Sequence, residues 1–192
     1  DVCLEMSSLG KGDIREPFIE VTYPNGSSTT DMVFDRAEII QGKEEYDTLP
    51  GSYDDNGEVE QLVIYLKDRN YNLTLELHYY VYEKCDIITR SAKLVNSGNE
   101  SVRLERLMSM QLDLNESDYE LSFFNGAWAR EMNRSRIPIR AGKYVNESVT
   151  GTSSNRANPF FMIGRSSTTE DYGECYGFNL IYSGNHYEAA QV

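Results

Sequence analysis

A strict alternation of apolar and polar residues between positions 62 and 81 constrains the fold of this chain most. Apolar side chains occupy alternate positions at Leu62, Ile64 and Leu66, and again at Leu73, Leu75, Leu77, Tyr79 and Val81. Because successive side chains of a β-strand point to opposite faces, this spacing places one face of each run on a core. The turn-like stretch at 68–71 joins the runs, so the sequence predicts a β-hairpin with Thr74, Glu76, His78 and Tyr80 on its opposite face.

Further extended runs follow at short intervals along the chain. Fourteen Tyr and seven Phe favour strands, since aromatic and β-branched side chains fit a pleated, half-buried surface. Residues 102–114 fit a helical face in part, but alternation fits them better. We predict strands at 17–23, 29–34, 86–95, 102–114, 119–124, 127–132, 137–141, 144–150, 160–164 and 175–182. Strands at this spacing, separated by Gly, Asn and Pro, predict an all-β sandwich in one domain over residues 1–192.

The charge balance restricts the partners of the chain. Eighteen Lys and Arg against 31 Asp and Glu give a formal net charge of −13. Such a chain is repelled by polyanions, which argues against nucleic acid and anionic membrane surfaces. No run approaches the roughly 18 apolar residues of a membrane span. We therefore expect neither a nucleic-acid nor a membrane partner.

Cysteine and histidine are too few to suggest a metal or a cofactor. Cys3, Cys85 and Cys175 are an odd number without a CxxC spacing, so we expect free thiols and a cytoplasmic location. Histidine occurs at His78 and His186 only, and two histidines cannot make a three-histidine zinc site. We expect both to be surface residues, with no bound metal and no cofactor.

Two aromatic segments are candidates for a binding surface, residues 123–131 and 176–186. A sugar presents apolar C–H faces and hydroxyl groups, so aromatic rings flanked by Arg, Asn and His suit a saccharide, and the same residues suit a protein interface. The alternative is that Trp128, Phe178 and Tyr182 pack in a core or against another domain. The candidate residues are Trp128, Arg130, Tyr176, Tyr182, Asn185 and His186.

Several long blocks together resemble a known family. They are GKGDIREP (10–17), CDIITRSA (85–92), RLMSMQLDL (106–114), FNGAWARE (124–131), GTSSNRANPFFMI (151–163) and GECYGFNLIYSGNHYEAAQV (173–192). In this order they resemble the N-terminal domain of the family 36 glycoside hydrolases, the bacterial α-galactosidases. The resemblance runs along nearly the whole chain.

The resemblance implies a β-supersandwich, two large antiparallel sheets face to face, of the galactose mutarotase-like type. In that family the domain precedes a catalytic (β/α)₈ barrel, on which two Asp residues hydrolyse terminal α-galactosides such as melibiose and raffinose with retention. Neither barrel motif occurs here, so no catalytic residue is assigned. The chain is expected to be a truncated piece of the domain, lacking its earliest residues and its last strands. The implied partners are the parent barrel, the galactoside substrate and further copies in a tetramer.

Three functions stay open at this point. The first is a non-catalytic domain that braces the barrel and the oligomer. The second is a saccharide-binding module that uses Trp128 and the 176–186 segment. The third is an aldose epimerase activity, in which His78, His186 and a nearby Glu act as general acid and base.

Overall fold

The computed structural model describes residues 3–116 and 118–192. Over this part of the chain it contains twelve β-strands and one short 3₁₀ helix, η1 (Glu83–Cys85). Every ladder between strands is antiparallel, which confirms the all-β prediction. The chain forms two compact units, unit 1 with residues 1–45 and 52–113 and unit 2 with residues 46–51 and 114–192. The prediction of one domain over 1–192 stays a prediction.

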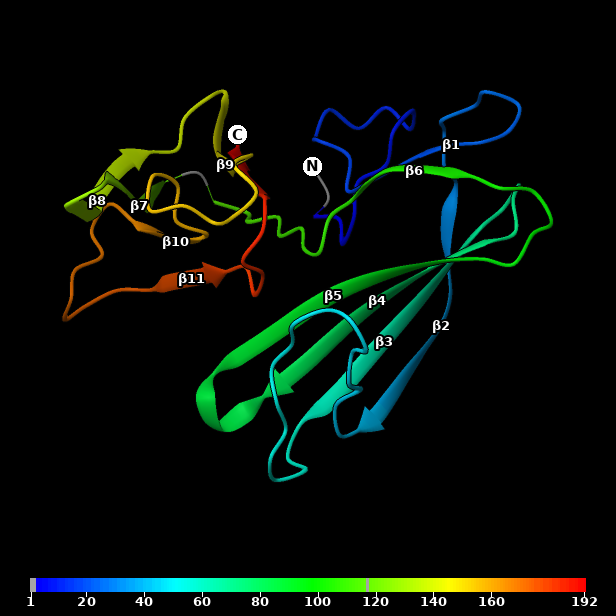
Figure 1. The fold of residues 1–192 in the computed structure, drawn as a ribbon, viewed down its shortest axis with the longest axis horizontal. Coiled ribbons are helices and arrows are strands. Elements are labelled where there is room, and N and C mark those ends of the chain that lie inside the picture. Colours follow the sequence, from blue (N-terminus) through cyan, green and yellow to red (C-terminus); the bar gives the residue numbers. More distant parts are fainter. Residues whose placement is uncertain (1–2, 117) are drawn as a thin grey trace. The chain divides into compact units, whose positions relative to one another are not determined.

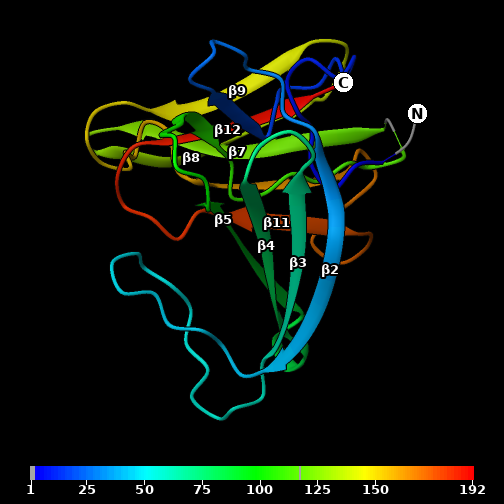
Figure 2. The ribbon, with the colours of Figure 1, turned by 90° about the vertical axis from the view of Figure 1, so that its right-hand side faces the viewer.

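Unit 1 holds a four-stranded sheet and a separate strand pair (Figure 1). Its strands are β1 (Ile19–Thr22), β2 (Met32–Gln41), β3 (Glu60–Asp68), β4 (Leu73–Tyr82), β5 (Ile87–Asn96) and β6 (Arg103–Leu107). The sheet has the order β2-β3-β4-β5 (Figure 2), and β1 pairs with β6. The hairpin predicted at 62–81 is β3 and β4.

A buried carboxylate fixes the turn of this hairpin. Asp68 is 7% exposed, and its Oδ1 accepts hydrogen bonds from the backbone N–H groups of Asn70 and Tyr71 at 2.8 and 3.0 Å. Its Oδ2 accepts bonds from the Tyr23 hydroxyl and the backbone N–H of Asp31. An Asp that bonds its own backbone two residues on is a strong turn former, and here it also ties the turn to two other segments.

The core of unit 1 lies on the face of the sheet that the alternation predicts. Buried side chains come from β4 and from the segment around β1: Phe18, Ile19, Val21, Tyr23, Leu73, Leu75 and Leu77. Half-buried apolar residues of β3, β5 and β6 pack around them. The predicted core periodicity weakens toward the end of β4, where Val81 is 38% exposed.

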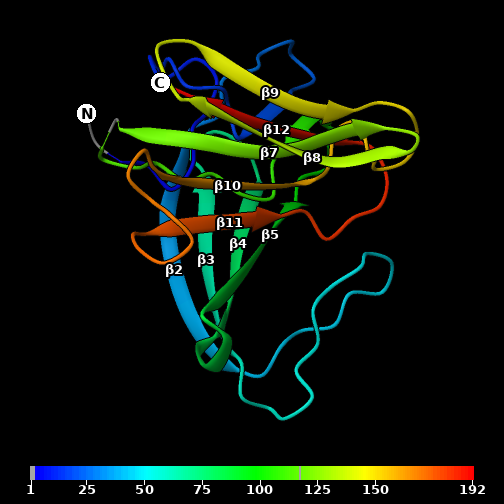
Figure 3. The ribbon, with the colours of Figure 1, turned by 90° about the vertical axis from the view of Figure 1, so that its left-hand side faces the viewer.

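Unit 2 repeats the plan with a second four-stranded sheet and a second pair. Its strands are β7 (Tyr119–Ala127), β8 (Arg130–Pro138), β9 (Lys143–Ser148), β10 (Phe160–Arg165), β11 (Cys175–Asn179) and β12 (His186–Gln191). The sheet has the order β11-β10-β7-β8, so β8 and β11 are its edge strands, and β12 pairs with β9 (Figure 3). Leu121 and Phe123 are buried, and the Phe123 ring lies 4.7 Å from that of Tyr144 on β9.

Several predicted strand bounds are wrong. The strand predicted at 102–114 ends at Leu107, because its partner β1 has only four residues. Beyond it, the side chains of Gln111 and Asp113 instead bond the backbone of Ser7 and Leu4. The separate strands predicted around 130 and 139 are one strand, β8, and β12 was not predicted. The described residues contain no helix long and apolar enough to cross a membrane.

Candidate functional site

Trp128 lies in the turn between β7 and β8 and is 90% exposed. Ala129 in this turn has a positive φ of 59°, and Met132, at 55°, lies in the first residues of β8 where the register with β7 shifts. The Ala129 N–H donates to Glu131 Oε1 at 2.8 Å. Gly126 permits the bulge beside it, because a Cβ there would meet the Arg130 carbonyl oxygen at 2.4 Å. The interpretation of Trp128 as a core residue of this chain is therefore wrong, and its packing against another domain stays a prediction. Arg130 is exposed as well.

The second aromatic segment is divided between β11, the loop that follows it and the first residue of β12. Tyr176 on β11 and Tyr182 in the following loop are 40% and 50% exposed, whereas the Phe178 ring stacks on Phe161 at 4.8 Å. Tyr182 folds over Gly184, where a Cβ would meet its ring at 2.4 Å. The side chain of Asn185 bonds the backbone, because its Oδ1 accepts a hydrogen bond from the Gly151 N–H at 2.7 Å.

The strand register decides which candidates share one end of the sheet. β11 runs alongside β10, which runs alongside β7, with Phe178, Phe161 and Phe123 in one row. The loop after β11 and the turn after β7 therefore lie at the same end of the sheet. Trp128 and Tyr182 belong to that end, whereas Tyr176 is two residues before the row and lies farther back along the strand.

His186 is not a surface residue, contrary to the prediction. It begins β12, is 6% exposed, and neither of its ring nitrogens has a hydrogen-bond partner in the described part of the chain. Burial lowers the pKa of His186 and keeps the ring neutral. On the same strand, burial raises the pKa of Glu188, against the hydrogen bond that Asn146 Nδ2 donates to its Oε2 at 2.8 Å.

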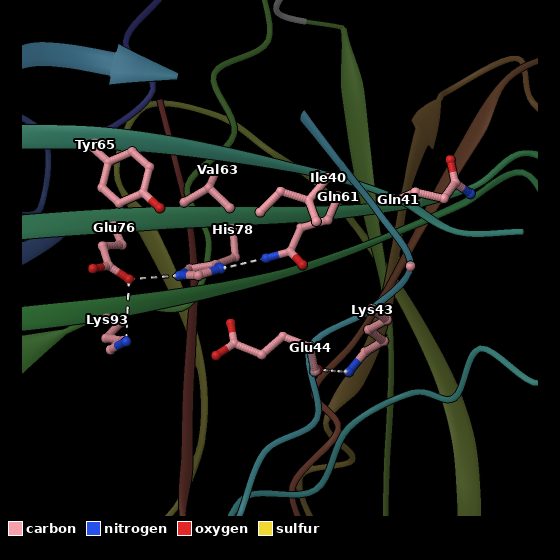
Figure 4. A pocket seen from close by; sticks show the side chains of 11 residues that line it. Ile40, Gln41, Lys43, Glu44, Gln61, Val63, Tyr65, Glu76, His78 and Lys93 are labelled. Carbon is pink, nitrogen blue, oxygen red and sulfur yellow. Dashed lines mark hydrogen bonds and ion pairs between the residues drawn. The ribbon is translucent and has the colours of Figure 1, made fainter. Parts of the chain in front are cut away.

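His78 is also buried, and it forms the floor of a hollow that the sequence did not reveal (Figure 4). The hollow lies on the face of β3, β4 and β5 opposite the core of unit 1, and the segment after β2 closes its other side. Its volume is about 560 Å³. Its lining residues are Ile40, Gln41, Gly42, Lys43, Glu44, Gln61, Val63, Tyr65, Glu76, His78 and Lys93.

A chain of polar contacts crosses the three strands at this floor. Gln61 Nε2 lies 3.0 Å from His78 Nδ1, and His78 Nε2 lies 3.3 Å from Glu76 Oε2. Lys93 Nζ approaches the same carboxylate oxygen at 3.5 Å (Figure 4). If the Gln61 amide donates to Nδ1, the N–H of Nε2 donates a hydrogen bond to Glu76.

The sequence contains a weak signal for this cluster. Glu76 and His78 occupy the alternate positions opposite the leucines of β4, which the alternation assigns to the outer face. Their partners Gln61 and Lys93 come from neighbouring strands, and only the register brings them together, with Lys93 opposite Glu76. His78 belongs to unit 1 and His186 to unit 2, and the epimerase interpretation stays a hypothesis.

Metal ligands do not gather among the residues that the structure describes, where no group of three or more His, Cys, Asp or Glu side chains could hold an ion. Cys85 and Cys175 are free thiols, and all three cysteines are exposed.

Comparison with known proteins gives consistent matches over the whole chain. Residues 1–192 match the family model described as "Glycosyl hydrolase family 36 N-terminal domain". The chain is 38% identical over 189 residues to α-galactosidase AgaA of Geobacillus stearothermophilus, covering 98% of this chain and 26% of that protein. It is 34% identical over 181 residues to α-galactosidase 2 of Hypocrea jecorina, covering 94% of this chain and 24% of that protein.

Solved structures match equally well. The α-galactosidase from Lactobacillus brevis superposes with a TM-score of 0.95 at 41% identity, covering 98% of this chain and 25% of that one. Family 36 α-galactosidase AgaB from Geobacillus stearothermophilus gives a TM-score of 0.96 at 36% identity, covering 100% and 27%. This likeness confirms the fold class predicted from the sequence. The chain spans about a quarter of the length of these relatives.

Proposed function

This chain belongs to the N-terminal domain family of glycosyl hydrolase family 36, and we propose that it is the non-catalytic β-sandwich domain of an α-galactosidase. The match over residues 1–192 against only a quarter of each relative carries this proposal. Three quarters of each relative lie outside the matched part. The catalytic barrel and its two Asp residues would be found in a corresponding portion of the parent protein.

The parent activity we propose is retaining hydrolysis of terminal α-galactosides such as melibiose and raffinose. The relatives support this substrate class, because variants of AgaA from Geobacillus stearothermophilus were crystallised in complex with raffinose and with stachyose. Retention requires two carboxyl groups about 5 Å apart on either side of the glycosidic bond. Those groups would come from the barrel.

In this proposal the domain braces the barrel and takes part in oligomer assembly. The exposed aromatic side chains of unit 2 support such a role, because Trp128 and Tyr182 are of the types enriched at interface anchors. A cytoplasmic location, as we also propose, would suit the exposed thiols of Cys85 and Cys175, since a reducing compartment keeps such groups reduced.

Hydrolysis of p-nitrophenyl α-galactoside tests whether the activity resides outside this domain. The purified 192-residue chain should show no turnover, whereas the parent protein, read past Val192, should be active. A parent protein with both barrel Asp residues changed to Asn is the control, and it should be as inactive as the chain alone. Turnover by the chain that persists through purification to homogeneity would contradict the proposal.

A saccharide-binding module is the second candidate, and the exposure of Trp128 favours it. At 90% exposure, next to the end of the sheet that carries Tyr182, its ring is available to stack on a sugar. The chain should then bind raffinose or melibiose, and Trp128→Ala should abolish that binding. Binding that is unchanged in Trp128→Ala would exclude this surface as the saccharide site.

A further inference from the structure

The hollow on the outer face of β3, β4 and β5 is built, rather than being an incidental gap between side chains. Gln61 and His78 at its floor are 3% and 5% exposed, although they lie on the face of the sheet away from the core. Buried polar groups need partners, and here each holds the other, so the ring of His78 and the carboxylate of Glu76 are fixed in orientation. A volume of about 560 Å³ lies within the range of small-molecule sites.

The opposite wall is positioned by the end of β2. Gly42, at a φ of +90°, turns the chain after the strand, and its N–H donates to the Val59 carbonyl oxygen at 2.7 Å. Gln41 Nε2 donates to the Gly57 carbonyl oxygen at 3.0 Å. These bonds anchor the segment that carries Lys43 and Glu44, so both walls of the hollow are held by hydrogen bonds.

The charges around the hollow are balanced. Two cations, Lys43 and Lys93, line it together with two carboxylates, Glu44 and Glu76. Because these charges cancel, a charged ligand of either sign gains no net attraction to offset the hydration that it loses on entering. A neutral ligand with several hydroxyl groups meets neither penalty, because each hydroxyl both donates and accepts.

The apolar part of the lining favours a ring over an open chain. Ile40 is 43% exposed and lines the hollow, so it offers an aliphatic contact beside the polar floor. A pyranose has one face of C–H groups and a rim of hydroxyls, which matches an aliphatic wall next to donors and acceptors. We propose that this hollow binds a neutral pyranose sugar, at a site separate from the Trp128 surface and independent of the parent's hydrolytic activity.

In this site the carboxylate of Glu44 accepts hydrogen bonds from sugar hydroxyls. It is exposed and has no ion-pair partner in the part of the chain that the structure describes. His78 is a positioning residue, since both of its ring nitrogens are occupied by Gln61 and Glu76. The open geometry predicts weak binding, with a Kd on the order of 1 mM.

Saturation-transfer NMR and calorimetric titration of the 192-residue chain test the proposal. The probes are D-galactose and D-glucose as neutral pyranoses, D-galacturonate and D-galactosamine as charged analogues, and galactitol as an open chain. The chain carries Trp128→Ala throughout, which removes the second candidate site. Glu44→Ala is the test variant, and Glu45→Ala is its matched control, since Glu45 is an exposed neighbour that does not line the hollow.

We expect the neutral pyranoses to bind more tightly than all three analogues. Loss of one hydrogen bond to a charged acceptor should weaken that binding at least about tenfold in Glu44→Ala and leave Glu45→Ala unchanged. Three results would overturn the proposal: no binding of either neutral pyranose, tighter binding of a charged analogue or of galactitol, or equal affinity in the Glu44 and Glu45 variants. Hydrolysis does not enter this assay, so its outcome is independent of the proposed function.

Discussion

Replacing Trp128 by Ala should leave the folding of the chain almost unchanged and weaken the assembly of the parent protein. The side chain is 90% exposed in the chain, so its removal takes away almost no buried apolar surface, and we expect the free energy of unfolding to change by less than about 0.5 kcal/mol. If the same ring becomes an anchor of an interface in the parent protein, its truncation should cost about 2 kcal/mol or more there. That difference corresponds to a weakening of association of about 30-fold.

The assay has two arms. Urea unfolding of the chain gives the first number, with Ile14→Ala as control, because Ile14 is 92% exposed in unit 1. Sedimentation of the parent protein over a range of concentrations gives the second. Ile14→Ala should leave both unchanged. A loss of about 2 kcal/mol in the unfolding of the Trp128→Ala chain would refute the surface position, and unchanged sedimentation and activity of the parent would refute the anchor.

Three further predictions concern stability. Leu75→Ala should lower the free energy of unfolding, measured by urea titration, by about 2–5 kcal/mol, because Leu75 is 0% exposed. The control variant Leu112→Ala, at a position that is 49% exposed, should change it by less than about 0.5 kcal/mol. Gly126→Ala should cost about 1–3 kcal/mol through its backbone clash at 2.4 Å, and Gly177→Ala, whose added Cβ would meet Phe160 at 3.4 Å, should cost clearly less in thermal melts. The lowered folded-state pKa of His186 predicts that its contribution to stability is complete above pH 6.5 and is lost as the pH falls below it. His186→Gln should therefore flatten that part of a curve of unfolding free energy against pH. An unchanged curve would contradict the buried neutral ring.

Much of the fold was predictable because the informative residues are close together in the sequence. The alternation from Leu62 to Val81 specifies the hairpin, and Asp68 specifies its turn. The end of the strand predicted at 102–114 was not predictable, because it depends on how far its partner β1 extends. β12 was missed because its apolar content is low.

The candidate site was predicted less well, since burial depends on neighbours that are distant in sequence. His78 occupies a polar-face position in the alternation, yet it is 5% exposed and both of its ring nitrogens contact neighbours, Gln61 and Glu76. The sequence also did not predict whether Trp128 is buried or exposed, because a Trp beside Gly and Ala fits a core as well as a turn. Positive φ at Ala129 decides the matter, and no pattern in the sequence announces it.

The two edge strands of the unit 2 sheet, β8 and β11, differ in how readily another strand can pair with them. β8 carries Arg130, Arg134 and Arg136 against one acidic residue, Glu131, so its net charge is positive and two copies of this edge strand would repel each other. β11 reads CYGFN and has no charged side chain between Cys175 and Asn179. An extended polypeptide can therefore add to this sheet at β11 with little electrostatic resistance, and at β8 only if it is acidic. Aggregation of the purified chain should accordingly begin at β11, and a Lys placed at Gly177 should delay it.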